Sequence, residues 1–243
     1  MFILISRRYF NAAIAMVGIL SLSLLTVAVH PHFEDWKREG LVITIVDTKV
    51  KAIAITFDDG PQPGVTSRLL DTLHRHNAHA TFFVLGVQAD KYPDIVRKAH
   101  LQGNEIANHG YSHQFTRYNR LDYAINDIEK ASQAIQKLTN TNNHLFRPPG
   151  GYLSDKMVDY CRDEDLKIVA WTWNQDTKDW AAISGRQIAS HILKNLEPGQ
   201  IVILHDGGGH RNEMLKGVEM LLTGLEAKGY QAVTVSELLA LAK

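Results

Sequence analysis

The chain has 243 residues, 45% of them hydrophobic, which is enough to bury a substantial core in one large domain or two small ones. Its 26 basic and 26 acidic residues cancel, so the net charge gives no argument for binding to nucleic acid or to an anionic membrane surface. The single cysteine, Cys161, excludes an internal disulfide and a zinc site built from cysteines.

The first thirty residues differ from the rest of the chain. Arg7 and Arg8 precede an uncharged stretch at 9–29 that consists mostly of Ala, Ile, Leu and Val. About twenty apolar residues behind a positive cluster are typical of a membrane-spanning helix whose arginines stay in the cytoplasm. We therefore predict a signal-anchor or transmembrane helix at 1–30, with the rest of the chain outside the cell membrane. A cleaved signal peptide, which would give a secreted protein, and a buried soluble helix are the alternatives.

Beyond residue 40, short apolar runs alternate with longer amphipathic stretches. The apolar runs predict strands at 41–46, 51–57, 80–86, 104–108, 166–173, 200–207 and 231–235, and a strand end with a loop at 145–151. Helical spacing predicts helices at 65–76, 92–101, 121–138, 186–196, 212–228 and 236–241, and Ser154 can cap another that runs to about residue 163.

This alternation predicts an α/β fold, with a mainly parallel sheet and the helices outside it. About seven parallel strands suit a distorted, incomplete (β/α) barrel, and a doubly wound open sheet is the alternative. Residues 31–50 would form a juxtamembrane link and the first strand, and 51–243 the main domain. Polar residues stand at several predicted strand ends, which share one face in a parallel barrel, and enzymes of that fold place their sites on this face.

The sequence AITFDDGP at 54–61 places Asp58 and Asp59 side by side where an apolar run meets a Gly-Pro turn. If the strand geometry persists, one side chain turns to each face of the sheet. One carboxylate could then bind a metal ion while its neighbour transfers a proton. For the tripeptide taken alone, two solvated acids in a turn are the alternative.

His109 and His113 stand four residues apart, so on a helical turn they would project from one face and could chelate one metal ion. With Asp59 they would form a triad of two histidines and one carboxylate, which accepts zinc, cobalt or nickel. Two ordinary surface histidines are the alternative for this pair by itself. No glutamate lies between the histidines, so the general base must come from elsewhere, and Asp58 could supply it.

Three further polar signals follow along the chain. Arg147 precedes a Pro-Pro-Gly-Gly loop, and near a catalytic aspartate it would keep that carboxylate ionised and oriented. Asp176 and Asp179 follow the predicted strand at 166–173, and His205 ends the apolar run at 201–204. Taken alone, these residues also fit a solvated loop and a hydrogen-bonded core histidine.

Together these motifs make the sequence similar to the NodB-homology polysaccharide deacetylases, also called carbohydrate esterase family 4. The resemblance covers about residues 51–239. Its five motifs occur in the family's order: TFDDGP from Thr56, the H-x3-H of His109 and His113, RPPGG from Arg147, DTKDW from Asp176 and ILHDG from Ile203.

The resemblance implies that Asp59, His109 and His113 hold one divalent metal ion, usually zinc in this family. It implies that Asp58 is the general base and that Arg147 fixes it in place. His205 would protonate the leaving amine, tuned by one aspartate of the fourth motif, Asp179 in preference to Asp176.

The resemblance also assigns substrate contacts. The backbone N–H of Gly150 would help to stabilise the oxyanion, and Trp180 and Ile203 would form the apolar pocket for the acetyl methyl group. Leu204 is also expected to contact the substrate. Many members of the family carry a tyrosine where this chain has Gly150, so a side wall of the groove is expected to be missing.

The function implied is that of a metal-dependent hydrolase removing N-acetyl groups from N-acetylglucosamine in an extracellular polysaccharide. A membrane anchor with an outward catalytic domain favours the cell's own peptidoglycan as the substrate. Chitin oligosaccharides, the O-acetyl groups of xylan, and a non-catalytic carbohydrate-binding role are the alternatives. The expected partners are the polysaccharide and the membrane, without nucleic acid.

Overall fold

The computed structural model describes residues 30–142, 144–181, 183–209 and 211–243. Within these ranges the strands form one eight-stranded sheet. The strands are β1 (Val42–Ile43), β2 (Ala52–Asp58), β3 (Thr81–Val84), β4 (Glu105–Asn108), β5 (Leu145–Phe146), β6 (Lys167–Val169), β7 (Ile201–His205) and β8 (Gln231–Val233). The strand pairings are parallel, in the order β1-β6-β5-β4-β3-β2-β7, and β8 pairs with β2 outside this path.

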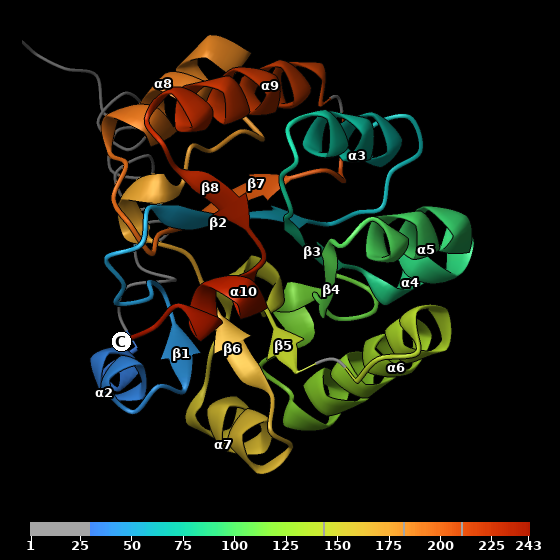
Figure 1. Ribbon diagram of the computed structural model, residues 1–243. Coiled ribbons are helices and arrows are strands. Elements are labelled where there is room, and N and C mark those ends of the chain that lie inside the picture. Colours follow the sequence, from blue (N-terminus) through green and yellow to red (C-terminus); the bar gives the residue numbers. More distant parts are fainter. Residues whose placement is uncertain (1–29, 143, 182, 210) are drawn as a thin grey trace, which may run out of the picture.

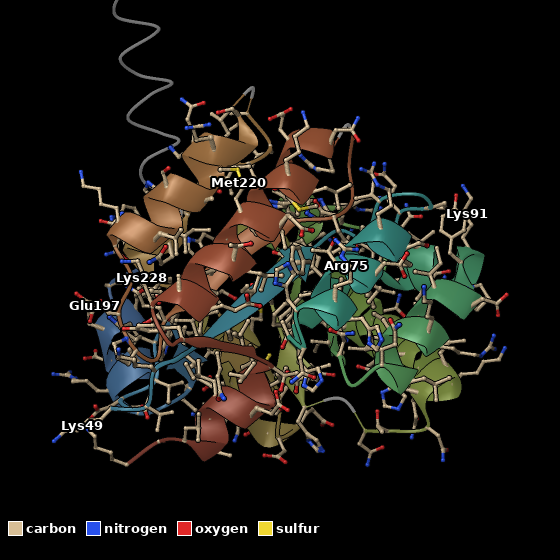
Figure 2. The ribbon with its side chains drawn as sticks, turned by 45° about the horizontal axis from the view of Figure 1, so that its top comes forward. Lys49, Arg75, Lys91, Glu197, Met220 and Lys228 are labelled. Atoms are coloured by element: carbon tan, nitrogen blue, oxygen red, sulfur yellow. The ribbon has the colours of Figure 1, made fainter. Side chains whose placement is uncertain are left out.

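Helices surround this sheet (Figure 1). They are α2 (Phe33–Arg38), α3 (Thr66–Arg75), α4 (Gly86–Lys91), α5 (Pro93–Leu101), α6 (Leu121–Thr139), α7 (Asp155–Asp163), α8 (Gly185–Lys194), α9 (Asn212–Ala227) and α10 (Val235–Ala240). Figure 2 shows Arg75 of α3 and Met220 of α9 on the outer surface of this helical layer. The predicted membrane segment falls at residues 1–29, outside the described ranges, and inside those ranges no helix is long and apolar enough to cross a membrane.

The sheet curls into a distorted barrel, as the βα alternation predicts. Two backbone bridges close the curve: Ile45, after β1, pairs with Gln200, before β7, and Asp176, after β6, pairs with Ile203 of β7. One apolar cluster fills the inside of the curve, where Ala54 of β2 and Phe83 of β3 meet Leu238 of α10. The longer helices pack against the outer face, and α10 covers one end of the curve, so the alternative of an open sheet with helices on both faces does not describe the fold.

The alternation of side chains along β2 explains which of its residues face the interior of the barrel. Ile53, Ile55 and Phe57 face outward and pack with the helices, whereas Ala52 and Ala54 face the interior. The same period places Thr56 and Asp58 on the inner face, at the C-terminal end of the strand. The small side chains of Ala52 and Ala54 leave room inside the barrel for the larger residues of the inner apolar cluster.

α10 closes the opposite end of the barrel. The backbone N–H of Val235 donates to Thr81 Oγ1, and the Ser236 hydroxyl contacts Glu105, so the helix lies against the N-terminal ends of β3 and β4. In Figure 1 α10 crosses the near end of the barrel. The C-terminal strand ends are therefore the ones left open to a substrate.

Two predicted strands are shorter in the structure, and two short helices were not predicted. The predicted strand 41–46 shortens to β1, because residues beyond it turn to the other edge, where the Val46 N–H donates to the Gly199 carbonyl at 2.9 Å. The predicted strand 166–173 shortens to β6. The six-residue helices α2 and α4 were not predicted, because so few residues carry no readable periodicity. Ser154 caps α7 as predicted, its hydroxyl accepting from the Met157 N–H.

Closure of the barrel makes Gly199 a sensitive position. Its φ is +80°, and an added Cβ would lie 1.8 Å from the Val46 carbonyl oxygen. We expect Gly199→Ala to lower the free energy of unfolding by well over the ~1–2 kcal/mol that left-handed backbone costs a non-glycine residue. Urea denaturation measures the loss. Gly229→Ala is the matched control, with φ +71° and open space around the new Cβ. Equal losses in the two variants would contradict the proposed clash.

Candidate active site

The acid pair lies at the open end of β2, and its geometry corrects the prediction that the two side chains turn to opposite faces. β2 ends at Asp58, and Asp59 adopts a left-handed conformation with φ of 72°. This change of conformation breaks the strand alternation. As a result both carboxylates approach the same imidazole: Asp58 Oδ2 lies 3.9 Å and Asp59 Oδ1 3.5 Å from His109 Nε2.

Arg147 holds Asp58 from inside the barrel. Its Nη1 donates to Asp58 Oδ1 and to Thr56 Oγ1, both at 2.7 Å. Its other nitrogens donate to the backbone carbonyls of Val169 at 3.0 Å and Ala170 at 2.9 Å. The ion pair is almost fully buried, with Arg147 1% and Asp58 2% exposed. One oxygen of Asp58 is thereby fixed on the guanidinium, and the other faces the histidines.

The two histidines of the H-x3-H motif lie on a loop after β4, not on a helical turn as predicted. Gly110 and His113 have positive φ angles of 74° and 56°, and these fold the loop back on itself. His109 forms a 2.8 Å hydrogen bond between its Nδ1 and the carbonyl of Arg147, so its Nε2 points toward the acid pair. The loop, rather than a helix, brings the two imidazoles to one side.

Asp59, His109 and His113 form a site that fits a divalent cation. Their ligand atoms all lie within 4.8 Å of one another. Asp59 Oδ1 is buried without a hydrogen-bond partner, 3.2 Å from His113 Nε2. Burial alone would raise the pKa of Asp59, but His109 and His113 hold it well below its usual range, and burial lowers the pKa of His113. An ionised carboxylate beside a neutral imidazole is the ligand form that metals require.

Asp127, on the buried face of α6, anchors the histidine loop and was not singled out from the sequence. Its Oδ2 accepts hydrogen bonds from the Tyr111 N–H and the Tyr118 hydroxyl, both at 2.8 Å, and its Oδ1 accepts from the Ser112 hydroxyl at 2.8 Å. The available signal was an aspartate on the apolar face of a predicted helix, three residues after Ala124 and one before Ile128. Such a buried acid needs several donors, and the loop supplies them.

His205, at the end of β7, pairs with Asp179. Its Nδ1 lies 2.8 Å from Asp179 Oδ1, and its backbone N–H donates to Asp179 Oδ2 at 3.0 Å. Asp176 instead accepts from the N–H of Lys178 at 2.9 Å. Burial alone would lower the pKa of His205, but the hydrogen bond to Asp179 and the charges of Asp58, Asp179 and Asp59 raise it. These interactions therefore favour the protonated imidazole of His205.

The structure separates the residues predicted to touch the substrate. Ile203 lies on β7 two residues before His205 and so shares its face, and Trp180 is 61% exposed beside Asp179. Leu204 is a correction: it is fully buried in the outer cluster with α3 and α9, because alternate residues of a strand face opposite ways. Its side chain therefore cannot line the acetyl pocket.

Phe115 occupies the side of the site that the sequence predicts to be bare. Gly150 has φ of 64°, and a Cβ at this position would lie 3.2 Å from the Phe115 ring. Phe115 is 47% exposed, and its ring centroid lies 6.0 Å from that of His113. An aromatic ring from the histidine loop thus stands beside the small Gly150.

Asp206 packs against the turn that follows the acid pair, and it was not singled out from the sequence. Its carboxylate accepts from the Thr66 hydroxyl at 2.5 Å and lies against Gly60, where an added Cβ would be 2.3 Å from its oxygens. Burial raises its pKa to about 7. The glycine of the DDGP turn is therefore required by the close approach of this carboxyl group.

The Asp127 network gives a test of the loop's role. Asp127→Asn removes the negative charge and replaces one accepting oxygen by an NH₂ group, so the bonds to the loop weaken and we expect the loop to loosen. Affinity for cobalt or zinc, measured by calorimetry on the purified protein, should fall about 10- to 100-fold, as for other residues that orient metal ligands. Asp122→Asn is the matched control on the same helix, since its exposed carboxylate bonds Arg120 alone among the described side chains. Unchanged affinity in Asp127→Asn would refute the anchoring role.

Comparison with known proteins agrees with this geometry. The family described as "Polysaccharide deacetylase" matches residues 45–169. A peptidoglycan-N-acetylglucosamine deacetylase of Bacillus cereus is 38% identical over 206 residues, which are 85% of this chain and 96% of that protein.

Two solved structures resemble the fold closely. The Bc1960 peptidoglycan N-acetylglucosamine deacetylase has a TM-score of 0.80 and 30% identity, covering 86% of this chain and 97% of its own. A family 4 acetyl xylan esterase from Clostridium thermocellum, in complex with a cobalt ion, has a TM-score of 0.72 and 30% identity, covering 79% and 91%. The chain belongs to the polysaccharide deacetylase family, carbohydrate esterase family 4.

Proposed function

We propose that the protein is a metal-dependent hydrolase that removes N-acetyl groups from the N-acetylglucosamine units of peptidoglycan. One observation carries the proposal: the buried Arg147–Asp58 pair stands directly beside the cluster of Asp59, His109 and His113. A fixed carboxylate next to a metal-binding triad is the arrangement that hydrolysis of an unactivated amide requires.

Zinc is the metal we propose, with cobalt and nickel as alternatives, because two imidazoles and one carboxylate accept all three. Asp59, His109 and His113 would hold it. When bound, such an ion polarises the acetamide carbonyl and makes water a better nucleophile. The structure of a related family 4 esterase is a complex with a cobalt ion, which supports a divalent metal ion here.

The side chains divide the proton transfers between them. Asp58, oriented by Arg147, would accept a proton from the attacking water. His205, paired with Asp179, would donate a proton to the amine nitrogen as the carbon–nitrogen bond breaks, so that acetate and a free amino sugar leave. The N–H of Gly150 would stabilise the negative charge that develops on the carbonyl oxygen. Trp180 and Ile203 would enclose the methyl group.

The relatives support peptidoglycan as the substrate, because two similar deacetylases, one compared by sequence and one by structure, carry this polymer in their names. Chitin oligosaccharides contain the same sugar, and acetyl xylan is the substrate of the related esterase. A non-catalytic role would require a broken triad or a missing base, and the described residues contain both intact. We also propose that the stretch at 9–29 anchors the domain outside the cell membrane, on the basis of Arg7, Arg8 and the uncharged run behind them.

The acid and metal roles are tested together by acetate release from peptidoglycan and from chitin oligosaccharides. Asp58→Asn should lower kcat by about 10²- to 10⁴-fold, the usual contribution of a general base, while metal binding persists. His109→Ala and a chelator should each abolish activity through loss of the metal. Full activity in His109→Ala would end the metal assignment. Release from chitin alone would keep the mechanism and change the substrate.

The pH profile tests the acid role of His205. Asp179 raises the pKa of His205, so the protonated imidazole persists to higher pH, and activity should fall only as pH rises through that raised value. Asp179→Asn removes the negative charge, lowers this pKa and should shift the alkaline limb of kcat to lower pH. Asp176→Asn, in the same loop but without contact to His205, should leave the limb in place. An unmoved limb in Asp179→Asn would exclude the pairing as the source of the proton.

A further inference from the structure

A second group of metal-ligating side chains lies outside the active site. His30 and His32 precede α2, and Asp155 is the first residue of α7. Each offers one ligand atom, and these three atoms all lie within 4.8 Å of one another. The described residues contain one other group of this kind, the cluster in the candidate active site.

Packing between α2 and α7 brings the three residues together. Trp36 of α2 is buried in one apolar cluster with Met157 and Val158 of α7. The two helices lie beside β1 and β6, on the same side of the molecule (Figure 1). Because His32 precedes α2 and Asp155 begins α7, these two polar side chains meet at the exposed rim of the cluster.

Trp36 also holds the two imidazoles in place. The His30 ring stacks on the indole, with the ring centroids 4.4 Å apart and an angle of 24° between the planes. The His32 ring meets the same indole edge-on at 6.3 Å, and its backbone N–H donates to His30 Nδ1 at 3.4 Å. Pro31, between the histidines, restricts the backbone further. Both rings are therefore placed before an ion binds, which lowers the entropic cost of binding it.

The charges at this rim favour a cation. Asp155 Oδ1 lies 2.7 Å from His32 Nδ1, and in the part of the chain that the structure describes Asp155 pairs with no lysine or arginine. By contrast, the two acids in the first turn of α2 pair with a lysine and an arginine of the same helix. The Asp155 carboxylate thus lacks a fixed positive charge beside it, and a bound metal ion would supply one.

The donor set decides which ion would fit. Two imidazoles and one carboxylate suit Zn²⁺, Cu²⁺ and Ni²⁺, whereas Ca²⁺ and Mg²⁺ prefer oxygen ligands. The side chains of His32 and Asp155 are 53% and 56% exposed, so an ion can reach them and water can complete its coordination. An ion pair between these two side chains would leave His30 without a role, whereas a metal ion would use all three residues.

We propose that His30, His32 and Asp155 form a second metal site, which binds a divalent transition-metal ion such as Zn²⁺. The ion would tie the start of α2 to the start of α7. Because α7 begins shortly after the loop that carries Gly150, the ion would also brace the C-terminal end of that loop. The three ligands take no part in the proposed reaction, so the role of this site is structural.

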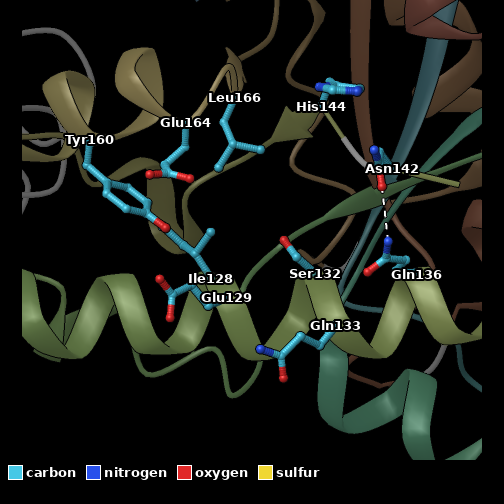
Figure 3. A pocket seen from close by; sticks show the side chains of 10 residues that line it. All are labelled: Ile128, Glu129, Ser132, Gln133, Gln136, Asn142, His144, Tyr160, Glu164 and Leu166. Atoms are coloured by element: carbon cyan, nitrogen blue, oxygen red, sulfur yellow. Dashed lines mark hydrogen bonds between the residues drawn. The ribbon is translucent and has the colours of Figure 1, made fainter.

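His144 provides a matched comparison. Like His32, it is an exposed histidine next to an aspartate, with its Nδ1 3.4 Å from Asp165 Oδ2. It lines a cavity of about 350 Å³ between α6 and α7, where Figure 3 shows it apart from the carboxylates of Glu129 and Glu164. Among the described residues, no group of three possible ligands includes it. His144→Ala therefore removes a histidine–aspartate pair without removing a proposed metal ligand.

Calorimetric titration with zinc tests the second site in the full-length protein, prepared without a polyhistidine tag and stripped of metal. The wild type should bind two ions per chain. The second should bind about 10- to 100-fold more weakly, because its histidines lack a partner like the Arg147 carbonyl that orients His109. His32→Ala should lose the weaker ion and keep the tighter one. Asp155→Asn should lose it as well, although the amide keeps the size of the side chain, and His144→Ala should bind as the wild type does.

Thermal unfolding gives a second measurement, in the His109→Ala background where the catalytic cluster is incomplete. Added zinc should still raise Tm in this variant, because an ion that binds only the folded chain stabilises it. The rise should disappear when His32→Ala is added. At saturating zinc, His32→Ala alone should release acetate at the wild-type rate, since its side chain is not part of the reaction.

A single site in the wild type that His109→Ala abolishes would overturn the second site and leave the catalytic assignment standing. Isotherms of His32→Ala and Asp155→Asn that match the wild type would do the same. Loss of an ion in His32→Ala, with no loss in His109→Ala, would instead support the second site and refute the catalytic one. A wild type that binds no ion would end both assignments.

Discussion

The buried ion pair of Arg147 and Asp58 is the interaction on which the site depends. Two charges at 2.7 Å with almost no exposure are costly to bury, and removing either partner of such a pair typically costs ~3–5 kcal/mol. Arg147 offsets its desolvation through bonds to β2 and to the carbonyls after β6, while itself following β5. The Asp58 carboxylate is therefore positioned only when these three strands have assembled.

Three other carboxylates also hold parts of the site in place. Asp127 gathers the donors of the histidine loop, Asp179 holds His205, and Asp206 lies beneath the DDGP turn. The donors differ from case to case: they belong to the histidine loop for Asp127, to His205 of β7 for Asp179 and to Thr66 of α3 for Asp206. These contacts tie the loops at the open end to the packed helices and strands.

Local patterns predicted most of the elements because their signals are local. The apolar run of β2 and the helical periods of α3, α6 and α9 appear in the structure with ends shifted by one or two residues. The prediction failed where a conformation depends on distant contacts. Asp59 leaves the strand geometry in the turn packed against Asp206, and the H-x3-H pair lies on a loop because Asp127, fourteen or more residues away, binds its backbone. Neither contact can be predicted from the residues whose conformation it changes.

The sequence by itself determined the order of the five motifs, the βα alternation and the residue types able to bind a metal and transfer protons, because these are properties of neighbouring residues. Only the tertiary structure decided that Asp179 rather than Asp176 contacts His205, and that Leu204 faces away from the site. It also decided that Phe115 stands beside Gly150. These pairings join residues from separate strands and loops, and closure of the barrel fixes their distances.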